Sequence, residues 1–509
     1  MYIAPNTVVR ILRNCPLDNT YDHTIYFSSA TAQRNYFMGL TAYTFSNLSY
    51  NRLNRGQLKV NRRAEDMYNC NYMMYQNSSF GDRWFYAFIT SVEYVSNDVS
   101  LITFEIDVMQ TWFFDVEIEQ CFVEREHVMN DAIGANLQPE PVNLGEYVYD
   151  GYTTSGHMTN MVIVIHSNVD SEGEEVLPKL NGGVFQGTAA IYFPADDGGV
   201  VNMRGVLDRY GNWDELNENV VACYMYYDDF MVDTVSNTLR PVEIDISKNK
   251  HYSDLDGYVP KNNKLFTYPY NFMLVTTDAG DSVELHYEFF STSNCQFRLS
   301  GDNTPSPVVM MRPMYYKGCD ALRNEMLVIG NFPQCTFNID SFKAWLSQTA
   351  SNPDILSGAI TSGIMGGIAG GPVGAAAGVA SSVISSGVST AVSGLMAENN
   401  PPLVKGTAHS AGTYGAGMKD FYFFPATIQA DYAKRIDNFL DVYGYAVNEH
   451  KIPNRNGRPH WNYVKNKVTN LVGNAPADDV AKIVSIYNNG ITFWNNGSEV
   501  GNYSLDNTL

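Results

Sequence analysis

The sequence predicts a mainly β protein with some helix (α+β). Aromatic residues make up 13% of the 509 residues, with 34 Tyr and 26 Phe, whereas only 17% of the residues are charged. Aromatic side chains suit the pleated, half-buried surface of a sheet. Alternating apolar and polar runs recur along the chain, which is the pattern of half-buried strands. A chain of this length can form two to four domains with a sizeable core.

The formal net charge of −21 argues against a general nucleic-acid-binding protein, because phosphate contacts need Lys and Arg. An acidic surface suits a protein that DNA passes without binding, but a surface kept acidic for solubility explains the composition equally well. Residues 1–70 are an exception, with eight Lys/Arg against four Asp/Glu. The basic run NRLNRGQLKVNRR (residues 51–63) is either a solvated loop face or a contact for an acidic partner or subunit.

The seven cysteines are scattered, odd in number and never spaced as CxxC, at positions 15, 70, 121, 223, 295, 319 and 335. This pattern disfavours a disulfide framework and structural zinc, so we expect folding in a reducing cytoplasm and no cofactor. The opening residues MYIAPNTVVRILRNCP lack the 7–15-residue apolar core of a secretory signal.

The first domain, residues 1–145, is predicted to be a β domain whose first 125 residues form strands. Its clearest element is a hairpin of two alternating runs, Trp84–Val95 and Val99–Val108, joined by Ser96-Asn97-Asp98. In the second run Phe104, Ile106 and Val108 are expected on one face, and Glu105 and Asp107 on the other.

Residues 146–262 read as an inserted, mainly β domain with acidic loops. Apolar runs such as MVIVIH and VVACYMYY are short, and turn-rich stretches (DSEGEE, ADDGG, RYGNWDE) separate them. DSEGEEVL and DLDG lack the spacing and distal glutamate of an EF-hand, so we interpret both as solvated loops. Residues 263–350 return to strands in KLFTYPYNFMLVTT and VELHYEFFSTSNCQFRLS, and SFKAWLSQT predicts a short helix.

The C-terminal part, residues 403–509, is predicted to be α+β. KDFYFFPATIQADY alternates like a strand, and DYAKRIDNFLDVYGY predicts a helix with Ile436, Phe439, Leu440 and Tyr443 at helical spacing. A second helix is predicted in PADDVAKIVSIYNNG, where Pro476 opens the helix, acids fill its first turn and Gly490 ends it.

Between these parts, residues 351–402 contain an apolar, glycine-rich loop. Residues 355–397 are 43 consecutive residues without an ionisable side chain, and fourteen of them are large aliphatics. Glycines recur every four residues at 363, 367 and 371, a spacing that lets apolar helices approach closely, and Gly370-Gly371-Pro372 interrupts any helix. Arms of about 16 and 25 residues would be about 24 and 37 Å long as helices, against about 30 Å for a bilayer core.

Three interpretations of this segment compete. A permanent membrane span is weak, because glycine and serine dilute the hydrophobicity and no Lys/Arg flanks set an orientation. A flexible linker is weak, because a solvated tether has no use for fourteen aliphatic residues. Exposing them to water forgoes about 20–40 kcal/mol relative to burial, against a domain stability of about 5–15 kcal/mol. We therefore expect a conditionally exposed membrane-inserting loop that is sheltered at rest, most easily against copies of itself in an oligomer.

Sequence patterns for catalysis are missing. The nine histidines form no HxH or HExxH pair, and the chain has no GxSxG elbow or P-loop. His127, in VEREHVMND, is interpreted as a structural hydrogen-bonding group rather than an acid/base residue. Two-carboxylate glycosidase chemistry stays open, because 54 acidic residues offer many pairs. We expect no enzymatic activity.

Several stretches occur in the order found in one family: NYMMYQNSSFGDRWFYAF, FEIDVMQTWFFD, VEREHV, KLFTYPY, the uncharged block, ENNPPL, FLDVYGYAVN and NNGITFWNNGSEVGNYSLDN. Together they resemble the tail knob (distal tail tube) proteins of small short-tailed, picovirus-type phages of Gram-positive bacteria. The resemblance runs from about residue 70 to the last residues. The segment 146–262 is divergent.

The resemblance implies a homohexameric tube whose wall consists of tail-tube and hub-like β domains, assembled in the host cytoplasm and located at the tail tip of the virion. The expected partners are other tail proteins, phage DNA passing without sequence-specific binding, and the host cytoplasmic membrane. Hydrophobic loops would plug the lumen and, on infection, enter that membrane to form a pore for DNA ejection. A purely structural tube or receptor-contacting knob, whose loops only seal the channel, is the alternative, and a cell-wall hydrolase is less favoured.

By position, the uncharged block is this loop, with Gly370-Gly371-Pro372 as its tip. The residues expected to form its membrane-active surface are Ile355, Ile360, Gly363, Ile364, Gly367, Ile368, Gly370, Gly371, Pro372, Val379, Val383, Ile384, Val388, Val392 and Leu395.

Overall fold

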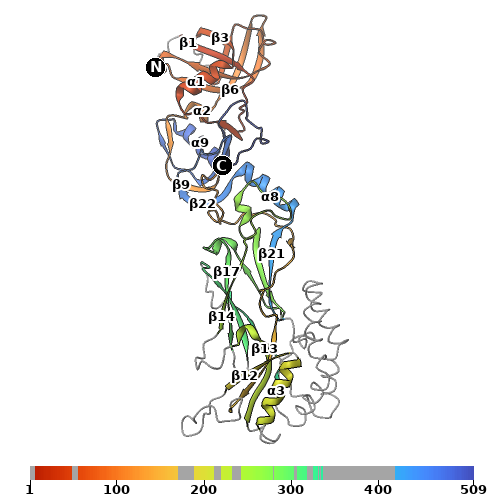
Figure 1. Cartoon of the computed structure of the whole chain (residues 1–509). Coiled ribbons are helices and arrows are strands. Elements are labelled where there is room, and N and C mark those ends of the chain that lie inside the picture. The colour runs from red at the N-terminus through yellow and green to blue at the C-terminus, as the bar shows by residue number, and fades with distance from the viewer. Residues whose placement is uncertain are drawn as a thin grey trace. The chain divides into compact units, whose positions relative to one another are not determined.

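The computed structural model describes residues 6–48, 56–169, 189–195, 197–210, 219–231, 242–278, 280–302, 307–317, 325–330, 332, 334–335 and 419–509. The chain divides into two compact units (Figure 1). Unit 1 comprises Met1–Leu144, Tyr258–Leu265 and Asp431–Leu509, and unit 2 comprises Gly145–Gly257 and Phe266–Ala430. The chain therefore passes between the units four times.

The N-terminal part of unit 1 contains a six-stranded sheet in the order β3-β1-β5-β6-β7-β4. Its strands are β1 (Thr7–Arg13), β3 (Thr41–Leu48), β4 (Gln57–Val60), β5 (Cys70–Gln76), β6 (Trp84–Ser96) and β7 (Val99–Ile106). The predicted hairpin is confirmed, because β6 and β7 pair antiparallel. Asp107 was wrongly predicted to share a strand face with Glu105. It is buried, ends the strand and caps α2 (Val108–Thr111), accepting a hydrogen bond of 3.1 Å from the Gln110 backbone N–H.

The expectation that the first 125 residues form strands was also wrong for α1 (Ala30–Gly39). The Ser29 side chain caps this helix by accepting a hydrogen bond from the Ala32 backbone N–H at 3.2 Å. Only Gln33 and Phe37 are fully buried on it. With so few buried positions the helix has no apolar stripe, which is why the periodicity of the sequence does not reveal it.

The rest of unit 1 combines the two ends of the chain. A five-stranded sheet has the order β2-β25-β23-β9-β22, and β2 pairs with β25 in parallel. Its strands are β2 (His23–Ile25), β9 (Cys121–Glu126), β22 (Tyr445–Lys451), β23 (Trp461–Val468) and β25 (Ile491–Trp494), and β8 (Val116–Ile118) pairs separately with β24 (Leu471–Gly473). One apolar cluster that includes Leu12, Phe88, Ile486 and Phe493 joins residues from both ends of the chain.

Both predicted C-terminal helices are confirmed as α8 (Ala430–Tyr443) and α9 (Ala477–Asn489). On α8, Ile436 and Leu440 are buried as expected, whereas Tyr443 is exposed. Gly490 follows α9 with φ +99°, and its backbone N–H donates to the Ile486 carbonyl at 3.0 Å.

Unit 2 contains three four-stranded sheets, β10-β21-β15-β16, β12-β11-β13-β20 and β14-β17-β18-β19. The strands are β10 (Tyr147–Tyr149), β11 (Met161–Ser167), β12 (Ala189–Pro194), β13 (Val220–Tyr227), β14 (Val242–Lys248), β15 (Asn271–Thr277), β16 (Ser282–Leu285), β17 (Cys295–Asp302), β18 (Val308–Met314), β19 (Leu327–Ile329), β20 (Gln334–Cys335) and β21 (Phe421–Ile428). One apolar cluster contains Val164, Val275, Leu299 and Phe423, so all three sheets share a core.

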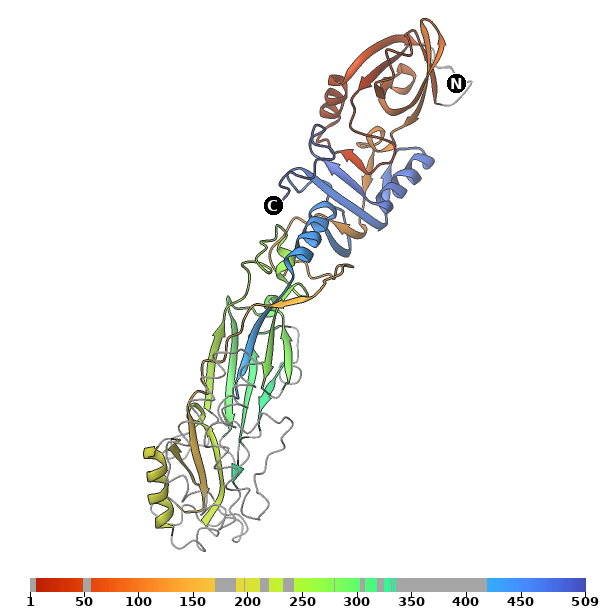
Figure 2. The same ribbon diagram turned by 90° about the vertical axis from the view of Figure 1, so that its right-hand side faces the viewer.

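The runs MVIVIH, VVACYMYY and KDFYFFPATIQADY form β11, β13 and β21 as predicted. Helix α3 (Asp197–Arg209), which the sequence analysis missed, packs on one face of the β12-β11-β13-β20 sheet (Figure 2). Its glycines at 199 and 205 look like turn residues, but Met203, Val206 and Leu207 pack against Ile163 and Ile165. The expected strand at KLF is also wrong, because Asn263–Phe266 forms a 3-10 helix.

Candidate functional site: the roots of the apolar segment and a buried polar network

The residues expected to enter a membrane lie outside the described residues. They are Ile355, Ile360, Gly363, Ile364, Gly367, Ile368, Gly370, Gly371, Pro372, Val379, Val383, Ile384, Val388, Val392 and Leu395. The predicted short helix SFKAWLSQT and the stretch DSEGEEVL also lie outside them. Within the part of the chain that the structure describes, we find no helix long and apolar enough to cross a bilayer.

Both ends of the segment 336–418 start from strands of unit 2. On its N-terminal side, β20 pairs with β13 at the edge of its sheet. On its C-terminal side, β21 lies between β10 and β15. We call these flanking stretches, residues 330–335 and 419–421, the roots of the segment. Main-chain hydrogen bonds within unit 2 hold both of them.

Lys419 connects the two roots. Its ammonium donates to the carbonyl of Gly330 and lies 5.2 Å from the ring centroid of Phe332, so it contacts the chain just before β20. Its backbone N–H donates to the hydroxyl of Tyr227 at 3.0 Å, and this hydroxyl donates to the Lys419 carbonyl at 2.7 Å. Burial lowers the pKa of Lys419. A buried ammonium is costly unless it is paired, so these contacts fix the position of Lys419 just before β21.

The neighbouring Asp420 is half-buried. Its Oδ1 accepts hydrogen bonds from the backbone N–H groups of Phe421 at 2.7 Å and Ser155 at 3.2 Å. Burial raises the pKa of Asp420 to about 6, against the effect of these bonds and of the Lys248 charge. The first strand after the segment is thus fastened by a carboxylate as well as by its sheet.

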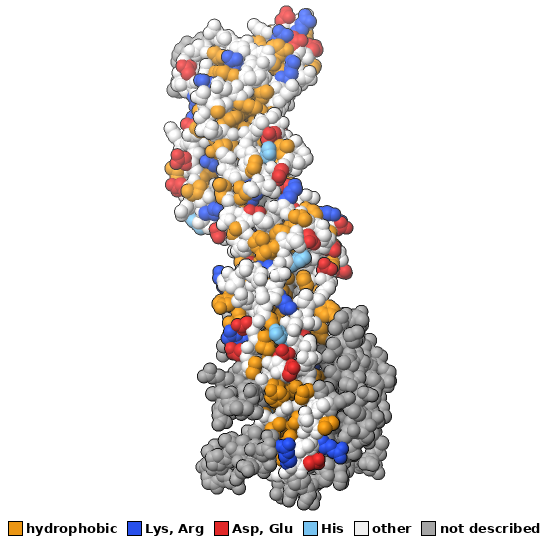
Figure 3. All heavy atoms as spheres, viewed as in Figure 1, with side chains coloured by type: hydrophobic (Ala, Val, Ile, Leu, Met, Phe, Trp, Pro, Cys, Tyr) orange, Lys and Arg blue, Asp and Glu red, His pale blue; other side chains and the backbone are white. Residues whose placement is uncertain are grey.

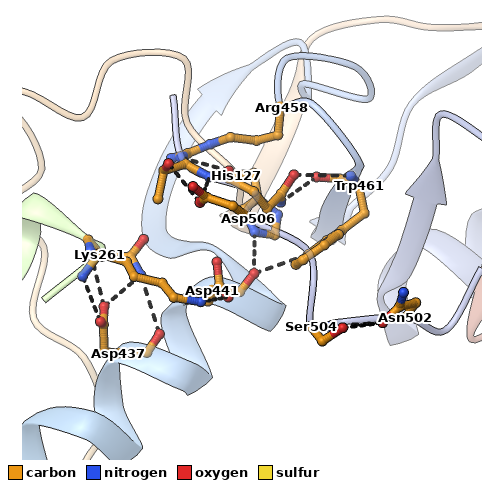
Figure 4. A network of polar contacts seen from close by, with 12 residues as sticks. His127, Lys261, Asp437, Asp441, Arg458, Trp461, Asn502, Ser504 and Asp506 are labelled. Carbon is orange, nitrogen blue, oxygen red and sulfur yellow. Dashed lines mark hydrogen bonds and ion pairs between the residues drawn. The ribbon is translucent and has the colours of Figure 1, made fainter. Parts of the chain in front are cut away.

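A buried polar network surrounds the C-terminal turns of α8 in unit 1 (Figure 4). The carbonyl of Asp441, near the end of α8, accepts from His127 Nε2 at 2.9 Å and from Trp461 Nε1 at 3.1 Å. His127 Nδ1 accepts from the backbone N–H of Tyr463 at 2.8 Å. These partners require the neutral imidazole protonated on Nε2, and burial lowers the pKa of His127 to about 3. This geometry supports the structural interpretation of His127.

Asp437 receives the chain segment that returns to unit 1 from unit 2. One of its carboxylate oxygens accepts from Tyr258 Oη and the Lys261 backbone N–H, each at 2.7 Å. The other accepts from Asn262 Nδ2 at 2.7 Å and from its backbone N–H at 3.1 Å. Asp437 is 1% exposed. A single buried carboxylate therefore holds residues 258–262 against α8.

Two further buried glutamates complete the network. Glu140 pairs with Arg125 and Lys264, and Glu126 pairs with Lys451 and accepts from the Asn454 backbone N–H at 2.7 Å. No set of three or more His, Cys, Asp or Glu in the described ranges could hold a metal ion. The network joins distant segments and leaves its carboxylates engaged with protein donors, so its role is structural.

Of the basic run 51–63, residues 56–63 are described. Arg62 forms an ion pair of 2.7 Å with Asp66, and its guanidinium lies 4.5 Å from the ring centroid of Tyr43. This arginine is thus paired within its own unit.

Comparison with known sequences assigns the family. A model of the C-terminal domain of tail knob protein gp9 of Bacillus phage phi29 matches residues 235–508, and a model of the N-terminus of the caudoviral major tail protein matches residues 5–117. The chain belongs to the gp9 family of phage tail knob proteins. The resemblance noted from the sequence is confirmed.

Members of the gp9 family match the chain over nearly its whole length. The tail knob proteins gp9 of Bacillus phages PZA and phi29 are each 27% identical over 592 aligned residues, which cover 99% of this chain and 98% of the relative. The solved tail knob protein gp12 of bacteriophage C1 has a TM-score of 0.59 at 14% identity, with 97% of this chain and 98% of that chain covered, and shows a similar fold. As a gp9-family member, the chain is a structural component of a phage tail.

Proposed function

We propose that the chain forms a homohexameric tail knob that conducts DNA during ejection, together with other tail proteins. In this proposal the segment 355–397 plugs the lumen at rest and enters the host cytoplasmic membrane on infection. The observation that carries the membrane role is 43 consecutive residues without an ionisable group in a chain of net charge −21. Exposing such a block to water is unfavourable in free energy, whereas placing it in lipid is favourable.

The roots of the segment support this proposal. The described chain on either side of residues 336–418 is joined through the contact of Lys419 with Gly330 and Phe332, and both sides belong to unit 2. A segment that has both ends fixed in the same wall can transfer its middle into lipid while the wall stays intact.

The distribution of charge between the units also supports the conduit. Unit 1 contains 20 Lys/Arg and 24 Asp/Glu, whereas unit 2 contains 13 Lys/Arg and 30 Asp/Glu. Most of the net negative charge therefore belongs to the unit that carries the apolar segment. Like-charge repulsion would keep the phosphate backbone from adhering while it passes.

Dye release from anionic liposomes tests the membrane role. The full chain should release dye, and a variant lacking residues 355–397 should not. Ile364→Asp and Val383→Lys should abolish release, because a charge at the bilayer centre costs about 2.5–3.5 kcal/mol or more per copy. Ile364→Leu serves as the matched control and should release dye like the wild type.

Equal leakage from the full chain and the deletion variant would remove the membrane role. Absence of leakage from both, with DNA lost prematurely from virions carrying the deletion, would favour loops that only seal the channel. We further propose that the chain has no enzymatic activity, and clearing of host cell walls by the purified protein would refute this.

A further inference from the structure

The β14-β17-β18-β19 sheet of unit 2 has one buried and one outer face. Leu299 on β17 and Val309 and Met311 on β18 are fully buried in the core. The residues between them point to the opposite face, because side chains alternate along a strand. Figure 3 shows acidic and basic side chains close together at the level of β14 and β17. This outer face is therefore a charged surface on an otherwise apolar sheet.

Arg298 on β17 has its hydrogen-bonding groups engaged on this face. Its Nε and Nη2 donate to the two carboxylate oxygens of Asp245 at 2.6 and 2.9 Å. Its Nη1 donates to Glu243 at 2.8 Å. Both acids lie on the neighbouring edge strand β14. The bidentate geometry satisfies the guanidinium within the sheet.

Arg312 lies directly opposite Arg298 in the β17–β18 register, but its guanidinium is poorly satisfied. Its one ion pair among the described residues is a 3.4 Å contact of Nη2 with Glu243, which already serves Arg298. Its Nε is buried without a hydrogen-bond partner. An arginine stays charged at any relevant pH and presents five donors. The Arg312 side chain is nevertheless 35% exposed, so the outer end of its guanidinium can reach an acceptor from outside the sheet.

The surroundings of Arg312 have the composition of a protein interface. Met310 and Met314 lie two residues away on the same face and are half-buried, and Tyr315 is 60% exposed. Next to them is a hollow of about 260 Å³, lined by residues that include Asp245, Met314 and Tyr315. Arg, Met and Tyr are the residue types enriched at interface cores, and methionine adapts its shape to a partner.

We propose that this face, centred on Arg312, is a contact surface for a second copy of the chain, which presents a carboxylate to Arg312. The inference rests on the proposed ring. In a ring each contact is heterologous, so this face meets a different surface of the neighbouring copy. Unit 2 carries 30 Asp/Glu against 13 Lys/Arg, so a neighbouring copy offers more carboxylates than cations. Arginine pairs with a carboxylate in a fixed, bidentate geometry, which suits the register of a closed ring.

Sedimentation velocity of the full-length protein over a range of concentrations tests the proposal. Arg312→Glu should raise the dissociation constant of assembly at least tenfold, and Arg312→Lys should raise it less, because the charge remains but the planar fork is lost. Arg204→Glu is the matched control, since Arg204 is an exposed arginine of the same unit on α3. It should assemble like the wild type.

Met310→Glu provides a second variant in case Arg312→Glu fails to fold, and it should weaken assembly as well. If the wild type assembles and the folded Arg312→Glu and Met310→Glu variants assemble equally well, this contact is overturned and the ring is not. A wild type that stays monomeric at every concentration would overturn the ring and the contact together.

Discussion

Replacing Asp437 by alanine should destabilise unit 1 strongly. The substitution removes the acceptor of four hydrogen bonds, two from Asn262 and one each from Tyr258 and Lys261. Asn262 is 4% exposed, so its two donors cannot recover a water partner. Each buried donor left without an acceptor costs about 1–3 kcal/mol. The two bonds from Asn262 alone predict a loss of about 2–6 kcal/mol in the free energy of unfolding.

Urea unfolding followed by tryptophan fluorescence measures this loss. Four of the six tryptophans (Trp84, Trp112, Trp461 and Trp494) belong to unit 1, so the fluorescence reports mainly on that unit. With a slope of about 2–3 kcal/mol per molar urea, the midpoint should fall by about 1–3 M. Asn438→Ala, an exposed position on the same helix, is the control and should shift the midpoint little. A shift for Asp437→Ala as small as that of the control would refute the reasoning.

Three further predictions concern buried groups. Burial lowers the pKa of His127 to about 3, so below pH 6.5 the unfolded chain binds a proton that the folded unit does not, and stability falls on acidification. Between pH 7 and pH 5 this group should lower the free energy of unfolding by about 2 kcal/mol. His127→Gln should remove that part of the pH dependence, as measured by urea unfolding at both pH values. A pH dependence equal to that of the wild type would contradict this. Gly444→Ala should lower the free energy of unfolding by more than about 2 kcal/mol, because φ is +66° and an added Cβ would lie 2.3 Å from backbone atoms of Glu126. Gly501→Ala, with φ +82° but no atom within 4 Å, should cost about 1 kcal/mol, and equal midpoints in thermal unfolding would contradict the difference. Burial raises the pKa of Cys15 and Cys295 to about 12. Iodoacetamide at pH 8 should therefore modify neither thiol in the folded protein and both after unfolding, as measured by peptide mass spectrometry. Modification in the folded state would contradict this.

Elements with strong local periodicity were predictable from the sequence. The β6–β7 hairpin alternates over its whole length, and α9 has Pro476 before it and Gly490 after it. Helices α1 and α3 were missed because their packing depends on tertiary contacts. Only two residues of α1 are buried, so it has no apolar stripe, and two glycines in α3 interrupt its helical pattern.

Asp107 shows a different limit of sequence reasoning. Its alternation with Phe104 and Ile106 predicted a strand face shared with Glu105. The side chain instead caps α2 and accepts a hydrogen bond from the Tyr72 hydroxyl at 2.8 Å. Burial raises the pKa of Asp107 to about 6. A capping carboxylate can thus look like a solvated strand residue, because the residues that bury it come from elsewhere in the chain.

The apolar segment and its roots illustrate opposite cases. The segment stands out in the sequence because 43 residues lack charge. Its roots do not stand out, because Lys419 and Gly330 are far apart in the chain and become partners only through folding. Since one lysine contacts both sides, the described chain before and after residues 336–418 lies close together in unit 2. In the proposed function the ends of the loop stay in the wall while its middle leaves, and the contact between Lys419 and Gly330 would support this.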